Sequence, residues 1–94
     1  MRFTIIGAGN GGRAFAAYLS SIGHPVNLYN RSYNRIHHII KKGGIKSKGV
    51  IKGFYPIKKV TLNLEEAVTN ADVILIVTPA SAHKDIAQKI APFL

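Results

Sequence analysis

The chain has 94 residues, of which 47% are hydrophobic, with 13 lysines and arginines against 4 aspartates and glutamates. This length suits one small domain, and the apolar content excludes a disordered basic tail. The sequence contains no cysteine, which excludes disulfides, thiolate nucleophiles and cysteine-ligated metals. No apolar run reaches the roughly 20 residues of a membrane span, and the amino terminus is a poor match to a signal peptide. We therefore expect a cytoplasmic protein without a membrane partner.

Positive charge is concentrated in the first half of the chain. Residues 1–50 hold eight lysines and arginines and no acid, and the first carboxylate is Glu65. A net charge of +9 suits either a nucleic-acid surface or a phosphate-bearing ligand, and composition alone leaves both open.

The first elements alternate between strand and helix patterns. An apolar run over residues 3–6 is bounded by Gly7 and predicts a buried strand. Apolar residues then recur at helical spacing and predict one apolar helix face, made of Ala14, Phe15, Tyr18, Leu19 and Ile22. Gly23 is expected to end this helix as a left-handed cap.

The middle of the sequence adds a strand, a helix and a hairpin. Residues 26–29 predict a second strand, and Ser32 is expected to N-cap a helix that ends at Gly43 and Gly44. From residue 45 to 62, apolar residues alternate loosely with lysine, and the run is broken at Gly49, Gly53 and Pro56. This pattern predicts one or two short hairpin strands, followed by a sheet strand near residues 60–62.

The last third completes the alternation. Asn63 and Glu66 fit a capping box, and the branched run at 73–77 predicts a parallel strand covered on both faces. A final helix is expected over residues 80–91, with Ile86 and Ile90 facing inward. The whole pattern predicts an α/β fold of the Rossmann type. This fold has a parallel sheet in the spatial order 3-2-1-4, helices on both faces and a small β-hairpin insertion.

A glycine-rich segment follows the first strand. Gly7, Gly9 and Gly12 form the pattern G-x-G-x-x-G. In dinucleotide-binding folds the first glycine permits a tight turn, the second lets a pyrophosphate approach the backbone, and the third lets the helix pack close to the strand. A bare structural turn is the alternative. The position between a strand and an amphipathic helix favours dinucleotide binding.

The end of the second strand indicates which dinucleotide is bound. An NAD site usually has a carboxylate there, which accepts hydrogen bonds from the ribose hydroxyls, but this sequence has Asn30, Arg31 and Ser32. A guanidinium with neighbouring donors suits a 2′-phosphate, and Arg35 adds charge one turn further along. We therefore expect NADP(H) to be preferred over NAD(H). The alternative is a solvated Arg31 beside a Ser32 that only caps the next helix.

These motifs carry a family resemblance. The segment GAGNGGRAFAAYLSSIGHPVNLYNRS resembles the opening of the octopine/nopaline (opine) dehydrogenases, and VTLNLEEAVTNADVILIVTPASAHKDIAQKIAPFL is similar to the same family. The wider superfamily, which includes glycerol-3-phosphate dehydrogenase and ketopantoate reductase, shares the glycine motif and the Thr78-Pro79 pair after the strand at 73–77. An enzyme of that superfamily therefore stays an alternative. The resemblance implies NAD(P)H-dependent reductive condensation of a 2-oxo acid with an amine, or the reverse reaction.

The resemblance also implies a set of cofactor-binding residues. Around the pyrophosphate it places Gly7, Gly9, Asn10, Gly11 and Gly12. At the adenosine end it places Asn30, Arg31 and Ser32, and beyond the fourth strand Thr78, Pro79 and Ala80. His83, near the expected nicotinamide end, is a weak catalytic candidate, because a histidine there is more often solvent-facing.

The chain departs from this family in its length. In such enzymes a mostly helical C-terminal domain supplies the catalytic groups. We therefore expect residues 1–94 to be the N-terminal part of a dinucleotide-binding domain, without the C-terminal catalytic and substrate domain, and inactive alone. Half of a doubly wound sheet exposes apolar surface, so we also expect a homo-oligomer.

Two alternatives to a dehydrogenase remain. One is a non-catalytic NADPH-sensing module. The other is a nucleic-acid-binding module that uses the lysine-rich stretch at 41–59, in which Phe54 and Tyr55 are interleaved. We expect no nucleic-acid partner, because no nucleic-acid-binding motif accompanies this charge and lysines also protect hairpin edges from pairing. A metal site is not expected either.

Overall fold

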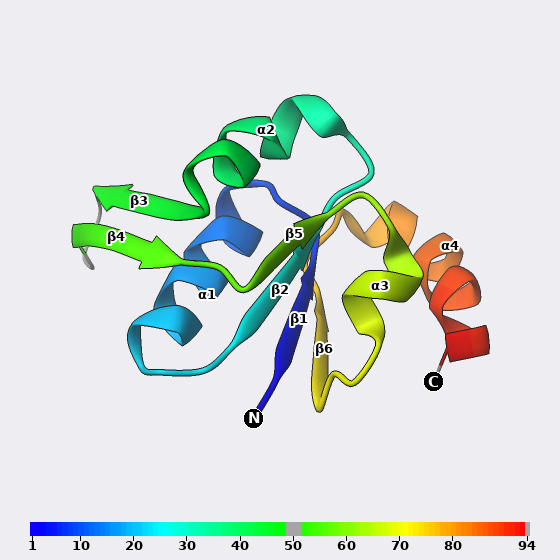
Figure 1. Ribbon diagram of the computed structural model, residues 1–94. Coiled ribbons are helices and arrows are strands. Elements are labelled where there is room, and N and C mark those ends of the chain that lie inside the picture. The colour runs from blue at the N-terminus through cyan, green and yellow to red at the C-terminus, as the bar shows by residue number, and fades with distance from the viewer. Residues whose placement is uncertain (49–51, 94) are drawn as a thin grey trace.

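Strands and helices alternate along the chain in the computed structural model, which describes residues 1–48 and 52–93 (Figure 1). The first half contains β1 (Phe3–Ile6), α1 (Asn10–Ser21), β2 (Val26–Tyr29) and α2 (Tyr33–Lys42). A hairpin follows, made of β3 (Gly44–Lys48) and β4 (Lys52–Pro56). The second half contains β5 (Lys59–Thr61), α3 (Leu64–Val68), β6 (Val73–Ile76), α4 (Ala80–Ile90) and a 3-10 turn at Ala91–Phe93. The break predicted at Gly49 lies outside the described residues.

Four strands form one parallel sheet in the order β5-β2-β1-β6. β1 lies centrally, with Ile6 opposite Tyr29 of β2 on one side and Ile76 of β6 on the other. The labels differ from the predicted 3-2-1-4 because the antiparallel hairpin of β3 and β4 supplies two strands outside this sheet. The observed fold is the predicted α/β class with a hairpin insertion.

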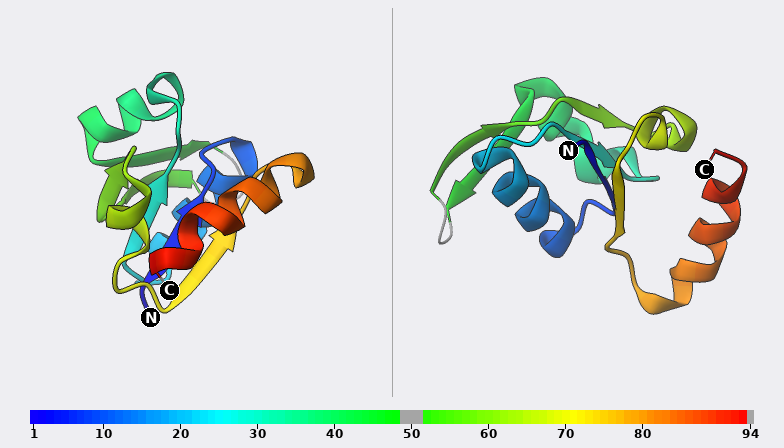
Figure 2. Two further views of the ribbon diagram at one scale, coloured as in Figure 1. Left: turned by 90° about the vertical axis from the view of Figure 1, so that its right-hand side faces the viewer. Right: turned by 90° about the horizontal axis from the view of Figure 1, so that it is seen from below.

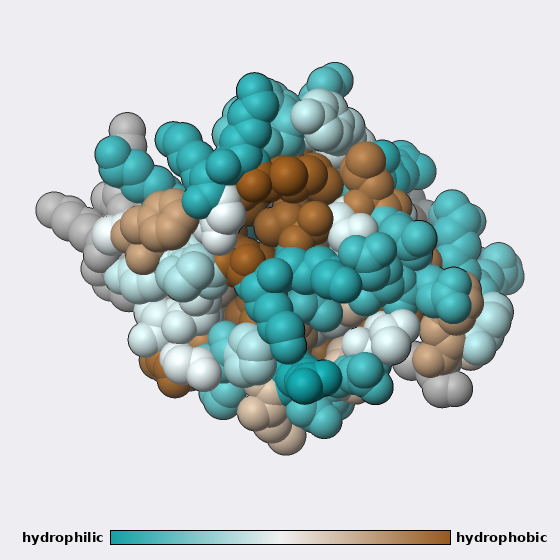
Figure 3. Space-filling model, viewed as in Figure 1, coloured by the Kyte–Doolittle hydropathy of each residue, from teal (hydrophilic) through white to brown (hydrophobic). Residues whose placement is uncertain are grey.

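Alternation along the strands creates two cores, one on each face of the sheet. Ile5 packs with α1, α2 and the hairpin, whereas Ile6 packs with α3 and α4. The view from below shows the sheet between these two layers (Figure 2). On the face seen in Figure 1, apolar residues are visible near the centre and hydrophilic residues surround them (Figure 3). No helix among the described residues has both the length and the apolar character to cross a bilayer.

Helix α1 buries a different face from the one predicted. Phe15, Tyr18 and Ile22 are 50%, 51% and 53% exposed, and of the predicted apolar set only Leu19 is buried. The buried positions are Gly12, Ala16, Ala17 and Leu19. The reason lies at the start of the helix, where a Cβ built on Gly12 falls 1.7 Å from the Gly7 carbonyl oxygen. Because α1 lies this close to the sheet, only small side chains fit between them, and the large side chains of α1 point to solvent.

Two helix caps form as predicted and two differ. Gly23 and Gly43 have φ of 94° and 72°, as left-handed helix ends require. Ser32 occupies the N-cap of α2, but its side chain makes no capping bond. Asn63 Oδ1 accepts from the Glu66 N–H at 3.0 Å, so half of the predicted capping box is present.

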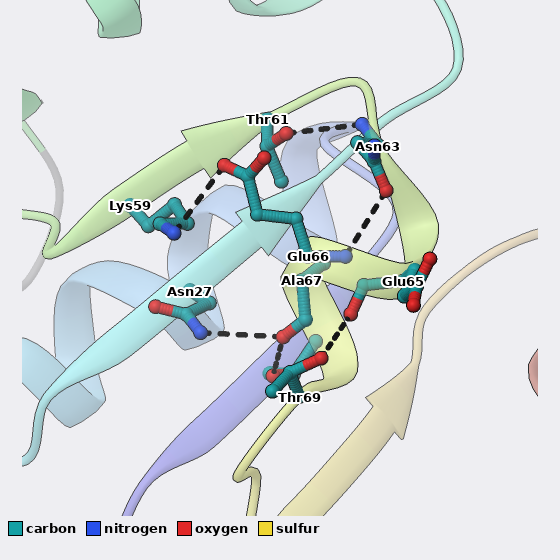
Figure 4. Close-up of polar contacts among 9 residues, drawn as sticks. Asn27, Lys59, Thr61, Asn63, Glu65, Glu66, Ala67 and Thr69 are labelled. Atoms are coloured by element: carbon teal, nitrogen blue, oxygen red, sulfur yellow. Dashed lines mark hydrogen bonds and ion pairs between the residues drawn. The ribbon is translucent and has the colours of Figure 1, made fainter. Parts of the chain in front are cut away.

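The other half of this capping box is replaced by an ion pair. The Glu66 carboxylate lies 3.3 Å from Lys59 Nζ of β5, and the Asn63 N–H donates to Thr61 Oγ1 instead (Figure 4). The nearby Ala67 carbonyl accepts from Thr4 Oγ1 at 2.6 Å and from Asn27 Nδ2 at 3.2 Å. These contacts tie the short helix α3 to β1, β2 and β5.

β6 is less covered than the sequence predicts. All four of its residues are partly exposed, and β6 forms one edge of the sheet, as the predicted order 3-2-1-4 implies. The following helix behaves as predicted, since Ile86 and Ile90 of α4 are buried.

Candidate functional site

The carboxyl ends of the four parallel strands share one edge of the sheet, and a cavity of about 470 Å³ opens there. Its walls come from the loops that follow β1, β2 and β6 and from the first turns of α2 and α4. In an open parallel sheet, ligands bind at this edge, in the crevice where the strand order reverses. The reversal here lies at β1, between β2 and β6.

Three glycines shape the first wall. Gly7 has φ of 114°, and a Cβ on it would lie 2.4 Å from the Val77 carbonyl oxygen. Gly12 is held against Gly7, so both positions exclude any larger residue. Gly9 differs, because a Cβ on it would meet nothing within 4 Å. Gly9 therefore borders open space, and packing within the protein does not explain why a residue without a side chain stands here.

The start of α1 faces this open space. Gly9 is the N-cap of the helix, and it forms no side-chain cap. The first N–H groups of an α-helix have no partner within the helix, and they carry a partial positive charge. No acid stands in the first turn of α1. This helix end is suited to an anion.

The second wall is the loop after β2. Asn30 Oδ1 accepts from the Ala8 N–H at 3.1 Å, and Asn30 Nδ2 donates to the Ser32 carbonyl at 3.2 Å. Arg31 and Arg35 are exposed and line the cavity. Within the described part of the chain, neither guanidinium forms an ion pair or a hydrogen bond. Two unpaired cations therefore border the cavity.

The third wall is the turn between β6 and α4. The hydroxyl Oγ1 of Thr78 is buried and has no hydrogen-bond partner among the described residues. Its backbone carbonyl accepts from His83 Nε2 at 2.8 Å, which holds the turn. His83 is exposed and is not among the described residues that line the cavity. The structure thus gives His83 a local positioning contact.

The structure brings most of the predicted cofactor-binding residues to this one cavity. Those that line it are Gly7, Gly9, Asn30, Arg31, Ser32, Thr78 and Pro79. Gly12 is buried under the loop, whereas Asn10 and Gly11 are exposed on α1, where Asn10 Oδ1 accepts from Arg13. Ala80 is the first residue of α4.

Several lining residues were not predicted as site residues. They are Ile6, Ala8, Tyr29, Val77, Ala82, Asp85 and Ile86. Ala82 and Ile86 follow Pro79 at helical spacing, so the inward face predicted for α4 already contained this signal. Asp85 of α4 lines the cavity, and its carboxylate lies 3.0 Å from Lys89 Nζ.

Comparison with known proteins now decides the family. Residues 2–94 match the family described as "NAD-dependent glycerol-3-phosphate dehydrogenase N-terminus". The chain belongs to this family. The predicted resemblance to this group of NAD(P)-dependent dehydrogenases is confirmed, and the chain corresponds to their NAD(P)-binding N-terminal domain.

Curated relatives extend the match. The chain is 40% identical to an opine dehydrogenase of Arthrobacter sp. (strain 1C), over 98% of this chain and 26% of the relative. It is 31% identical to a glycerol-3-phosphate dehydrogenase [NAD(P)+] of Thermoanaerobacter sp. (strain X514), over 96% of this chain and 27% of the relative. The chain thus spans about a quarter of the length of these relatives.

Solved structures share the fold. A 2-dehydropantoate 2-reductase from Methylococcus capsulatus superposes with a TM-score of 0.72 at 23% identity, over 99% of this chain and 31% of that one. An imine reductase from Pseudomonas sp. gives a TM-score of 0.67 at 20% identity, over 97% of this chain and 27% of that one. At these identities the likeness establishes the Rossmann-type fold.

Proposed function

We propose that this chain binds NADP(H), in preference to NAD(H), as the cofactor-binding portion of an opine-type dehydrogenase. The observation that carries the proposal is the meeting of a glycine-lined helix N-terminus with the unpaired Arg31 in one cavity. NADP(H) has a phosphate at both places, the pyrophosphate and the 2′-phosphate, whereas NAD(H) has only the pyrophosphate. In the family's chemistry the nicotinamide dinucleotide carries the hydride.

The cavity fits the pyrophosphate in two respects. The open space beside Gly9 leaves room for phosphate oxygens close to the backbone, and the first N–H groups of α1 have no partner within the helix. The buried Thr78 hydroxyl has no hydrogen-bond partner among the described residues, and a phosphate oxygen bound beside it would supply one. We propose that Gly9 and Thr78 contact the pyrophosphate region, while Gly7 and Gly12 shape the loop.

The preference for NADP(H) rests on the charges around the end of β2. Arg31 and Arg35 line the cavity there, and the Ser32 hydroxyl makes no capping bond. These groups suit a 2′-phosphate, which accepts charge-assisted hydrogen bonds from arginine. The only acid among the described lining residues is Asp85, and it comes from α4 rather than from the β2 end.

The reaction that we propose for the whole enzyme is reductive condensation of a 2-oxo acid with an amine, or its reverse. The family resemblance of the sequence and the 40% identity to an opine dehydrogenase support this proposal. A nicotinamide bound at this edge needs further protein to exclude water and to supply catalytic groups. We therefore propose that residues 1–94 are inactive alone. We also propose that the chain acts in the cytoplasm and that it self-associates into a homo-oligomer through the exposed edge of β6.

A second candidate is the same cofactor-binding role in a glycerol-3-phosphate dehydrogenase. The match of residues 2–94 to that family and the 31% identity to the Thermoanaerobacter relative favour it. The two candidates share the cofactor site and differ in the substrate. Activity assays of a full-length enzyme with 2-oxo acid plus amino acid, against dihydroxyacetone phosphate, separate them.

A calorimetric titration tests the cofactor proposal directly. NADPH is expected to bind the 94-residue chain in a one-to-one ratio with a dissociation constant at least tenfold below that of NADH. Equal or reversed affinities refute the NADP(H) preference. Tight binding of DNA that weakens steeply with salt, together with no NADPH binding, supports a nucleic-acid-binding module instead.

A further inference from the structure

Asn30 stands where an NAD-type site usually has its ribose-binding acid, yet both of its side-chain polar atoms face the protein. Its Oδ1 accepts from the Ala8 N–H in the loop after β1, and its Nδ2 donates to the Ser32 carbonyl in the loop after β2. Both bonds are partly buried. These two bonds of ordinary length, to two different loops, fix the orientation of the carboxamide relative to both loops.

The surroundings of Asn30 fix this geometry. Tyr29 lies opposite Ile6 in the β1–β2 ladder, and the Gly7 N–H donates to the Tyr29 carbonyl at 2.9 Å. The Asn30 N–H points the other way, to the Thr61 carbonyl of β5 at 3.4 Å. The backbone of Asn30 is therefore anchored in the sheet. From this anchor the side chain reaches to the point where both loops leave the sheet.

The chemistry of the position requires an amide. A carboxylate accepts the Ala8 N–H equally well, but it has no proton to donate to the Ser32 carbonyl and would place two acceptors against each other. A carboxamide has one acceptor and one donor group, in the order that the two loops demand. The lack of an acid at this position thus has a structural reason, in addition to the preference for a 2′-phosphate.

We propose that Asn30 is a positioning residue that couples the two phosphate-binding loops. It holds the glycine loop and the Arg31–Ser32 loop at a fixed separation, so that the pyrophosphate and the 2′-phosphate meet preformed sites at the same time. Asn30 contributes to affinity through the two loops and not by touching the ligand. This inference rests on the proposed binding of NADP(H).

Inorganic pyrophosphate and 2′-AMP report on the two loops separately. Pyrophosphate has no adenosine and probes the glycine loop, whereas 2′-AMP probes the Arg31–Ser32 loop. In the Asn30→Ala variant both ligands are expected to bind about threefold to tenfold more weakly, as the loss of a hydrogen bond that orders each loop predicts. Arg31→Ala is expected to weaken 2′-AMP alone. Phosphorus NMR titration measures both affinities.

Asn30→Asp isolates the donor half of the link. It keeps the size and the acceptor, and it removes the donation to Ser32. Its matched control is Asn34→Asp, which adds the same charge on the exposed side of α2 at a residue that does not line the cavity. Asn30→Asp is expected to weaken 2′-AMP at least threefold more than Asn34→Asp does.

The outcomes are distinct. Weakened 2′-AMP with unchanged pyrophosphate in Asn30→Ala identifies a direct adenosine contact and overturns the inference. Unchanged affinities with a lower melting temperature identify a merely structural residue and also overturn it. A wild-type chain that binds neither NADPH nor the two probes refutes the proposed function itself.

Discussion

The loop after β1 and the loop after β2 both line the cavity, but different contacts fix their conformations. Steric packing holds the first loop, where Gly7 and Gly12 have backbone atoms in the space of a Cβ. The side chain of Asn30 holds the second loop by its bonds to Ala8 and Ser32, and the neighbouring Arg31 remains exposed. Gly7 and Gly12 are therefore intolerant of any side chain, whereas the exposed Arg31 accepts substitution and is proposed to select the ligand. The four predictions below test this division.

Gly12→Ala is expected to have the largest effect, because its methyl group would overlap the Gly7 carbonyl oxygen at 1.7 Å. The helix must then move away from β1. We expect the free energy of unfolding to fall by about 3 kcal/mol or more, which leaves little folded protein. Urea unfolding followed by circular dichroism measures this. The matched control is Gly11→Ala, whose methyl meets only Val77 Cγ1, at 3.3 Å. Equal stability of the two variants would contradict the steric role of Gly12.

Gly9→Ala is expected to separate folding from binding. Its Cβ meets no protein atom within 4 Å, so the free energy of unfolding changes by less than about 1 kcal/mol. The same methyl occupies the space proposed for the pyrophosphate. NADPH and NADH are therefore both expected to bind roughly a hundredfold more weakly. Calorimetry on the folded variant checks this, and wild-type affinity for NADPH would remove the pyrophosphate from this side of the cavity.

Arg31→Ala is expected to affect one cofactor and not the other. Loss of a charge-assisted contact to the 2′-phosphate weakens NADPH binding by about tenfold to thirtyfold, and NADH binding changes less than about threefold. Arg2→Ala removes the same charge from a residue outside the cavity and serves as the control. A parallel loss of NADH affinity would show that Arg31 contacts the part common to both dinucleotides.

Arg35→Ala is expected to have the smallest effect. This residue lies in the first turn of α2, and its exposed charge acts on the ligand through solvent. We expect NADPH affinity to fall about twofold at low salt and to match the wild type at high salt. Titrations at two salt concentrations measure the difference. A salt-independent loss above tenfold would show that Arg35 contacts the phosphate directly.

Local patterns were sufficient for much of the fold and the site. The glycine spacing predicts the turn at Gly7, whose φ is 114°, and the close packing of Gly12 against Gly7, because both arise within one short segment. The contact of Gly7 with the Val77 carbonyl comes from a distant strand. The Asn30–Arg31–Ser32 segment was placed at the sheet edge because a strand pattern directly precedes it. The lining face of α4 was partly missed, since helical spacing alone does not indicate whether an inward residue faces a core or a cavity.

Other predictions failed where burial depends on what lies nearby. Phe15 and Tyr18 have the spacing of a buried helix face, yet they point to solvent because α1 approaches the sheet too closely for them. The apolar run of β6 predicts a strand covered on both faces, but all four of its residues are partly exposed at the edge of the sheet. In each case the residues are apolar as the pattern indicates, but the local sequence does not specify which neighbouring element covers them.

The sequence alone predicts that strands and helices alternate, that a glycine turn follows the first strand, and that an arginine follows the second. These features depend only on residues close together in the sequence, so the sequence alone determines them. The tertiary structure decided which face of α1 is buried, and it revealed that Asn30 bonds to Ala8, 22 positions away along the chain. Contacts of that kind arise only when β1 and β2 pair, because pairing brings the ends of distant segments within hydrogen-bond distance.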